Sequence, residues 1–139
     1  MTAFPAAVHH VALTVTDLEV SRTWYQRLLG ADPVIDEDVP DLPGHHKGFH
    51  HTIFALSSGV ILALHAHDAT DRSHQFDELR PGLDHVGFSC RDRHELEVLQ
   101  TRLDELGIRH GGIAEDALGN ALSFRDPDDI ALEFWAPRT

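Results

Sequence analysis

The sequence predicts an α+β fold built from two βαβββ modules, and three observations predict it. An alternating hexad at residues 10–15 is repeated 75 positions later at residues 85–90. Each hexad leads into a segment with helical periodicity, and each helical segment leads into three strand-like stretches. The halves are therefore similar modules, at residues 8–67 and 83–136, and together they make one domain spanning residues 1–139.

The first hexad, HVALTV, alternates with a period of two, as a half-buried strand does. The helix that follows it is expected over residues 18–29. Thr16 and Glu19 stand at capping-box spacing at its start. Gly30 is expected to end the helix, because glycine readily takes the left-handed conformation found after a helix C-terminus.

The second hexad, HVGFSC, is followed by a helix with the same layout. Asp92 and Glu95 have capping-box spacing, and Asp92 stands 75 positions after Asp17. Gly107 is expected to end this helix. Its buried face is predicted from leucines at helical spacing, namely Leu96, Leu99, Leu103 and Leu106.

Three strands are expected after each helix. They are residues 33–36, 51–56 and 60–65 in the first module, and residues 108–114, 121–124 and 130–135 in the second. Residues 57–59 and 126–129 are rich in serine, glycine, proline and aspartate and are predicted as hairpin turns. Residues 39–48 are predicted as a loop, and residues 66–83 link the modules.

Strand alternation assigns a face to each side chain. The apolar faces, suited to packing on the helices, comprise Val11, Leu13, Val15, Val60, Leu62, Leu64, Val86, Phe88, Cys90, Ile130, Leu132 and Phe134. The opposite faces carry His10, His85 and Glu133 among small residues, namely Ala12, Thr14, Ala63, Gly87, Ser89 and Ala131. Small side chains around two imidazoles and a carboxylate predict a cavity with a metal site. Such a site leaves coordination positions open for chemistry.

Composition narrows the class of partner. The chain has 139 residues, a formal charge of −12, 12 histidines and one cysteine. The acidic balance argues against nucleic acid or an anionic membrane surface as a partner. A single cysteine excludes an intrachain disulfide. Residues 1–7 show neither a basic region nor a long apolar run, and no stretch approaches the ~20 apolar residues of a membrane span, so a cytoplasmic protein is expected.

Four segments spread along most of the chain carry a family resemblance. They are HVALTVTDL at residues 10–18, residues 24–30 (beginning WY and ending LG), HVGFS at residues 85–89, and FRDPDDIALE at residues 124–133. In these segments and their order, the chain resembles the vicinal oxygen chelate superfamily. That superfamily includes glyoxalase I, extradiol dioxygenases, fosfomycin-resistance thiol transferases and bleomycin-resistance proteins. The resemblance implies that the two modules form an eight-stranded, incompletely closed barrel around a metal held by His10, His85 and Glu133. It also implies a homodimer, with or without exchange of modules between chains.

The chain departs from individual branches of that superfamily. Glyoxalase I has a fourth ligand, usually Glu, where this chain has Ala63. Extradiol dioxygenases add a second-sphere His, which His65 or His67 could supply, and a Tyr near the substrate. The only tyrosine here is Tyr25, on the first predicted helix. Bleomycin-binding members lack the metal triad. Asp129 replaces the glycine usual in the DPDG turn.

The resemblance and the intact set of His10, His85 and Glu133 predict a divalent-metal-dependent enzyme that acts on a small oxygen-chelating substrate. A dioxygenase-like reaction with Fe(II) is favoured, and Mn, Zn or Ni are the other metals considered. His65 and His51 are the candidate catalytic residues, as a base or hydrogen-bond donor. A glyoxalase-like isomerase or a thiol transferase is the alternative enzyme. A bleomycin-resistance-like protein that sequesters a small molecule is the alternative from another class.

The remaining histidines, the aromatic residues of the first helix and Cys90 are predicted to lie on the surface, in the core or at the edge of the cavity. His74, His94 and His110 are expected on the surface, and Trp135 is a candidate lining residue of the cavity. Cys90 faces the helix side and is predicted to be a buried structural thiol. Histidines near the loop could gate the cavity or simply be exposed (His45, His46, His50 and His51). Three residues of the first helix are expected in the core (Trp24, Tyr25 and Leu28).

Overall fold

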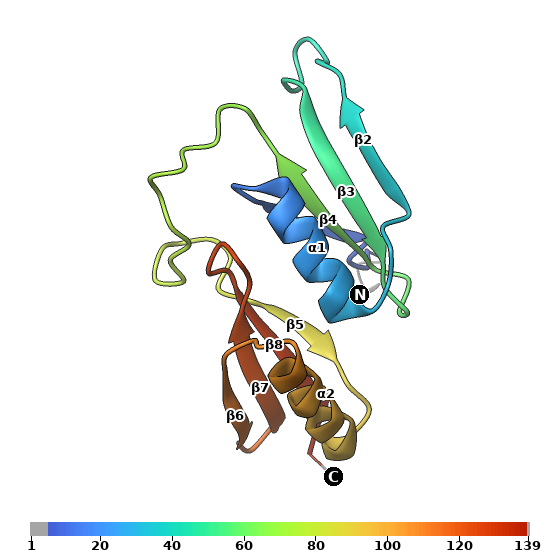
Figure 1. The fold of residues 1–139 in the computed structure, drawn as a ribbon, viewed down its shortest axis with the longest axis vertical. Coiled ribbons are helices and arrows are strands. Elements are labelled where there is room, and N and C mark those ends of the chain that lie inside the picture. Colours follow the sequence, from blue (N-terminus) through green and yellow to red (C-terminus); the bar gives the residue numbers. More distant parts are fainter. Residues whose placement is uncertain (1–5, 139) are drawn as a thin grey trace, which may run out of the picture. The chain divides into compact units, whose positions relative to one another are not determined.

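The computed structural model describes residues 6–138 and contains two compact units, which meet between Arg72 and Ser73 in the sequence. Each unit has one helix and one four-stranded sheet in the order β-α-β-β-β (Figure 1). The predicted α+β class and the two βαβββ modules are therefore confirmed. Most of segment 1–7, where no leader was expected, lies outside the described residues.

The first unit contains β1 (His10–Thr14), α1 (Leu18–Leu29), β2 (Ile35–Val39), β3 (Phe49–Ala55) and β4 (Ile61–Ala66). Its sheet has the order β1-β4-β3-β2. β1 runs parallel to β4, while β3 is antiparallel to both of its neighbours. The parallel contact is possible because α1 and the β2–β3 hairpin separate β1 from β4 along the chain.

The second unit contains β5 (Val86–Ser89), α2 (Arg93–Glu105), β6 (His110–Glu115), β7 (Gly119–Arg125) and β8 (Ala131–Pro137). Its sheet order, β5-β8-β7-β6, reproduces that of the first unit, with β5 parallel to β8. The 75-residue repeat is thus a repeat of topology as well as of sequence.

Each helix covers one face of its own sheet, and the apolar core of each unit lies between them (Figure 1). The largest fully buried side chains of the first unit are Val15, Tyr25, Phe54, Leu62 and Leu64, and those of the second are Leu96, Leu103, Leu122 and Leu132. These include residues that alternation assigned to the helix side. The opposite side of β1 and β5 is exposed, so this face remains available for a ligand.

The helix ends follow the predicted chemistry, with one correction. Asp17 begins α1 and accepts a hydrogen bond from the Val20 N–H, so the predicted Thr16 cap is wrong. A carboxylate is favoured there because it accepts a free backbone N–H and faces the positive end of the helix dipole. Asp92 caps α2 as predicted.

Strand β2 begins and ends later than predicted, and Val39 belongs to it rather than to the loop. The acidic run between its ends is unfavourable for a strand by composition. Cross-strand pairing compensates, since Asp38 and Glu37 stand opposite His50 and His51 of β3. Each of these facing pairs forms a side-chain hydrogen bond, and such cross-strand pairs stabilise a sheet edge.

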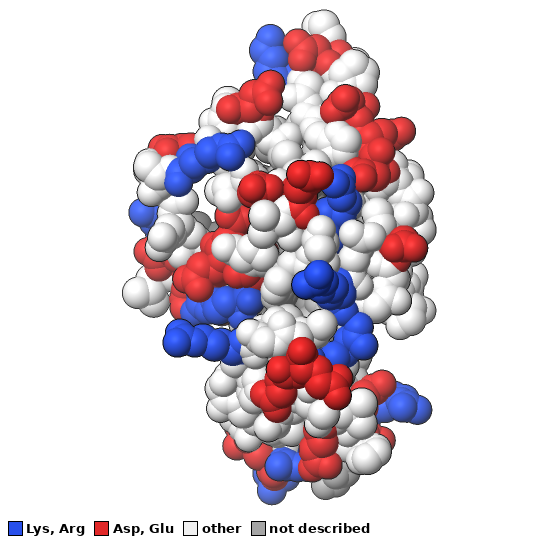
Figure 2. Space-filling model, in the orientation of Figure 1, with Lys and Arg blue, Asp and Glu red and all other residues white. Residues whose placement is uncertain are grey.

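The surface carries acidic side chains over much of the face shown in Figure 2. Among residues 6–138, no helix has the length and apolar character needed to cross a membrane.

Candidate metal centre

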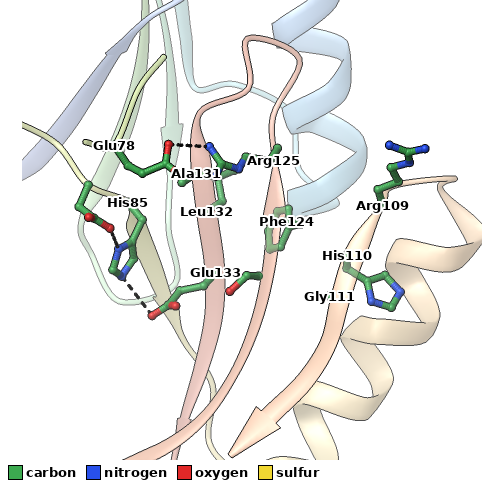
Figure 3. Close-up of a pocket in the computed structure, with 12 residues that line it drawn as sticks. Glu78, His85, Arg109, His110, Gly111, Phe124, Arg125, Ala131, Leu132 and Glu133 are labelled. Carbon is green, nitrogen blue, oxygen red and sulfur yellow. Dashed lines mark hydrogen bonds and ion pairs between the residues drawn. The ribbon is translucent and has the colours of Figure 1, made fainter. Parts of the chain in front are cut away.

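His85 and Glu133, two of the three predicted ligands, lie together on the exposed face of the second sheet. His85 immediately precedes β5, and Glu133 on β8 pairs with Gly87 of β5. The Nε2 atom of His85 is 3.3 Å from Oε1 of Glu133 (Figure 3). The parallel pairing of the two strands therefore brings residues 48 positions apart to one point on the sheet.

Asp84 fixes the orientation of the His85 ring. The Nδ1 atom of His85 is 2.6 Å from Oδ1 of Asp84, whereas it is the other ring nitrogen that faces Glu133. The hydrogen bond to Asp84, together with the nearby negative charge of Glu133, raises the pKa of His85. A proton held on Nδ1 leaves Nε2 to face Glu133, which is how carboxylates commonly orient a metal-binding histidine.

The distance between these two donors fits a shared divalent metal. An ion about 2.1 Å from an imidazole nitrogen and a carboxylate oxygen would separate them by about 3.0 Å at a right angle and about 3.4 Å at a tetrahedral angle. The observed 3.3 Å lies between these values. Two carboxylates around one imidazole also create the negative potential that attracts a cation.

A pocket of about 540 Å³ lies over this part of the second unit. Its size is typical of sites for small molecules. Besides Asp84, His85 and Glu133, its lining comprises Glu78, Arg109, His110, Gly111, Ser123, Phe124, Arg125, Ala131 and Leu132 (Figure 3). The small residues Gly111, Ser123 and Ala131 leave space above the sheet.

Glycine at position 87 keeps the carboxylate accessible. A Cβ atom there would lie 3.5 Å from Oε1 of Glu133, in ordinary contact, and a longer side chain would extend over the carboxylate. On the other side of β8, Ser123 pairs with Glu133 and exposes its hydroxyl. Sequence reasoning missed Ser123, although alternation along β7 places it on the same face as Arg125.

The third predicted ligand, His10, lies at the exposed start of β1 in the first unit. Its Nδ1 atom is 2.8 Å from Nδ1 of His9, so the two imidazoles share a hydrogen bond. Within either unit taken alone, the described residues include no group of three His, Cys, Asp or Glu side chains arranged to hold a metal.

His65 and His51, the candidate catalytic residues, are paired across β4 and β3 in the first unit. Phe49 stacks on His65 with ring centroids 4.5 Å apart, and His67 lies 5.2 Å from the same ring. Burial lowers the pKa of His65, and the neighbouring histidines lower it further. A neutral imidazole can accept a proton. His51 has a carboxylate partner, because its Nε2 atom is 3.3 Å from Oε1 of Glu37.

Three plainer predictions can be compared with the structure. His110 was expected on the surface, which is wrong: its side chain is 13% exposed, and its Nε2 atom lies 2.8 Å from Oδ1 of Asp104. Trp135 shares the Glu133 face but is not among the pocket-lining residues; its ring lies over Gly119 instead. Cys90 is buried, as predicted, and burial raises the pKa of its thiol to about 11.

The chain belongs to the Glyoxalase/Bleomycin resistance protein/Dioxygenase superfamily, whose family model matches residues 7–134. No curated protein matches it significantly. Among solved structures, a glyoxylase/bleomycin resistance protein/dioxygenase domain from Frankia sp. EAN1pec is 33% identical, with a TM-score of 0.77 over 98% of this chain and 94% of that chain.

Two further solved structures show the same fold at lower identity. A putative glyoxalase from Bacillus halodurans is 24% identical, with a TM-score of 0.69 over 96% of this chain and 98% of that one. The genomically encoded fosfomycin resistance protein FosX from Listeria monocytogenes is 16% identical, with a TM-score of 0.69 over 97% and 95%. A mutant of FosX was solved in complex with Mn(II) and 1S,2S-dihydroxypropylphosphonic acid. A protein with this fold has therefore been solved with a bound divalent metal.

Proposed function

We propose that the chain is a divalent-metal-dependent enzyme that acts on a small oxygen-chelating substrate. The observation that carries this proposal is the 3.3 Å pairing of His85 Nε2 with Glu133 Oε1, with Asp84 holding the other ring nitrogen. His10 of the first unit would supply the third ligand. The Mn(II) complex of FosX, a protein of the same fold, supports a divalent metal.

Three protein ligands would leave positions open for two vicinal oxygens of a substrate. A bound divalent metal would supply Lewis acidity, which stabilises negative charge developing on those oxygens. Asp84 would keep the His85 ring oriented, and Gly87 would leave room for substrate beside Glu133. The hydroxyl of Ser123 would donate a hydrogen bond to substrate.

Among the possible reactions, we favour a dioxygenase-like one with Fe(II). Ala63 is paired with Ala12 in the register that joins Glu133 to Gly87, so β4 offers no fourth carboxylate at that position. His65, two residues further along β4, would act as the base in its neutral form, and the stacked Phe49 would hold its ring in place. His51 would stay beside it as a hydrogen-bond donor.

Metal analysis of protein purified without a metal-affinity column tests the proposal. We expect near-stoichiometric binding of Fe(II) or Mn(II) by the native chain and loss of that binding in His85→Ala. His94→Ala is the control, because that imidazole is 84% exposed on α2. Equal metal content in native chain and His85→Ala would refute the metal centre.

Oxygen uptake distinguishes the reaction types. After anaerobic loading with Fe(II), the enzyme is offered catechol-type substrates in an oxygen electrode. Uptake by the native chain that falls in His65→Ala is the expected result. If iron binds and no substrate draws oxygen, the dioxygenase assignment is wrong, and isomerase or thiol-transferase chemistry replaces it.

We also propose that the chain forms a homodimer, as the resemblance to its superfamily implies, and that it lies in the cytoplasm. Light scattering coupled to gel filtration would show a mass of two chains. A single-chain mass at all concentrations would contradict the dimer.

A further inference from the structure

An ion pair occupies the end of the pocket away from the His85–Glu133 pair. The guanidinium of Arg125 donates two hydrogen bonds to the carboxylate of Glu78, with Nη2 2.6 Å from Oε1 and Nη1 3.2 Å from Oε2 (Figure 3). Both residues line the pocket. A planar guanidinium that holds a carboxylate in this forked arrangement can hold a carboxylate or phosphonate of a ligand equally well.

Arg125 belongs to the sheet, whereas Glu78 lies outside it. Arg125 lies on β7 and also donates a hydrogen bond to the carbonyl oxygen of Asp129, 3.0 Å away. Glu78 lies in a turn of the irregular segment between β4 and β5, and the next residue, Leu79, is 90% exposed. The guanidinium therefore keeps this second hydrogen bond when a ligand displaces Glu78.

Glu78 is fully ionised at neutral pH, since the hydrogen bond from Arg125 lowers its pKa to about 2. The pocket holds a second guanidinium, Arg109, which is exposed and has no ion-pair partner among residues 6–138. Arg109 immediately precedes His110, and His110 is paired with Phe124, the neighbour of Arg125. The pocket lining thus includes two guanidinium groups, Arg109 and Arg125, and the carboxylate of Glu78 is paired with the second of them.

We propose that the pocket binds a small acid whose carboxylate or phosphonate takes the place of Glu78 on Arg125, with Arg109 adding positive charge. Arg125 pairs with Ala131, two residues along β8 from Glu133, which is roughly 7 Å. A small molecule can span that distance. Contact between the other end of the acid and the metal rests on the proposed function, whereas binding of the acid to Arg125 does not.

Binding is measured on the full chain after treatment with EDTA, with methylphosphonate and propionate as probes and 1,2-propanediol as the neutral control. The readout is the NMR shift of the Arg125 Nε–Hε resonance together with the dissociation constant. We expect both anions to shift that resonance, and the tighter of the two identifies the acid group. Propanediol should leave it unchanged.

Two variants test the exchange with Glu78. Glu78→Gln should tighten binding of the better probe roughly threefold, the size expected for release of an exposed ion pair. Asp77→Asn removes the same charge from the neighbouring residue, whose carboxylate contacts Arg80 rather than Arg125, and should leave affinity unchanged. Arg125→Gln should abolish binding, while Arg93→Gln, an ion-paired arginine outside the pocket, should not.

The results separate this proposal from the metal proposal. The acid site is overturned if the probes bind no better to Glu78→Gln than to Asp77→Asn. It is also overturned if they bind Arg125→Gln as well as they bind the native chain. His85→Ala should lose Mn(II) while still binding the acid probe. A native chain that binds the probe through Arg125 but takes up no Mn(II) refutes the metal centre and leaves the acid site standing.

Discussion

Replacement of Asp84 by asparagine should weaken metal binding without removing a ligand. The amide of the Asp84→Asn side chain would still fit beside the His85 ring but would lose the charge that favours a proton on Nδ1 across 2.6 Å. Losing such an outer-shell partner typically costs about 10- to 100-fold in metal affinity. Because the Asp84 side chain is 73% exposed and that of His85 45%, solvent screens their interaction. We therefore expect the lower end, about tenfold, or about 1.4 kcal/mol in binding free energy.

Isothermal titration of Mn(II) into native chain, Asp84→Asn and Glu78→Gln measures this effect. Glu78→Gln is the matched control: it removes the same charge from the same pocket lining but leaves the hydrogen bond to His85 intact. A tenfold loss in Asp84→Asn and a smaller one in Glu78→Gln would show that ring orientation matters beyond charge. Equal losses in the two variants would refute the role assigned to Asp84.

Three further changes have defined outcomes. Gly87→Leu should reduce Mn(II) affinity about tenfold or more by covering Glu133, whereas Gly87→Ala, whose Cβ makes ordinary contact, should bind normally in the same titration. Asp129→Gly should raise the free energy of unfolding in urea by about 1 kcal/mol and Asp129→Ala should lower it, because position 129 has a left-handed φ of 64°. Hydrogen bonds to Asp36 and Asp38 raise the pKa of His50. The stability that protonated His50 contributes is therefore present in full below about pH 6.5 and is lost as pH rises through the raised pKa. His50→Gln should therefore cost about 1 kcal/mol in urea unfolding at pH 6 and less at pH 9, and a constant difference would contradict the charged pair.

Local sequence signals predicted the features that depend on one element at a time. Two-residue alternation assigned Leu13 and Leu132 to the core and Glu133 to the opposite face, because side-chain direction in a strand follows from position alone. The end of α1 was predicted for the same reason: Gly30 adopts a φ of 63° that few other residues tolerate. The cap of α1 was missed although Asp17 stood at the repeat position of Asp92.

The resemblance and the shared face predicted that His85 and Glu133 lie together, but other features that depend on two distant elements were not predicted. The ion pair of Arg125 with Glu78 joins residues 47 positions apart, and no periodicity relates an irregular segment to a strand. Strand β2 was misplaced because its acidic run is unfavourable by itself and is stabilised by partners on β3. Alternation places Ser123 on the right face, but its position beside Glu133 follows only from the β7–β8 register.

The two halves of the repeat have diverged where the chemistry is expected. The register that pairs Gly87 with Glu133 in the second unit pairs Ala12 with Ala63 in the first, so Ala63 is the counterpart of the carboxylate. Likewise His9, 75 positions before Asp84, stands beside His10 where the aspartate stands beside His85. The second unit therefore places two carboxylates around its histidine, whereas the first unit has His9 and Ala63 at the corresponding positions. A divalent metal bound by two neutral imidazoles and the one carboxylate of Glu133 would keep a net charge of about +1. An anionic substrate would balance that charge, and the guanidinium groups of Arg109 and Arg125 favour a substrate of the same sign.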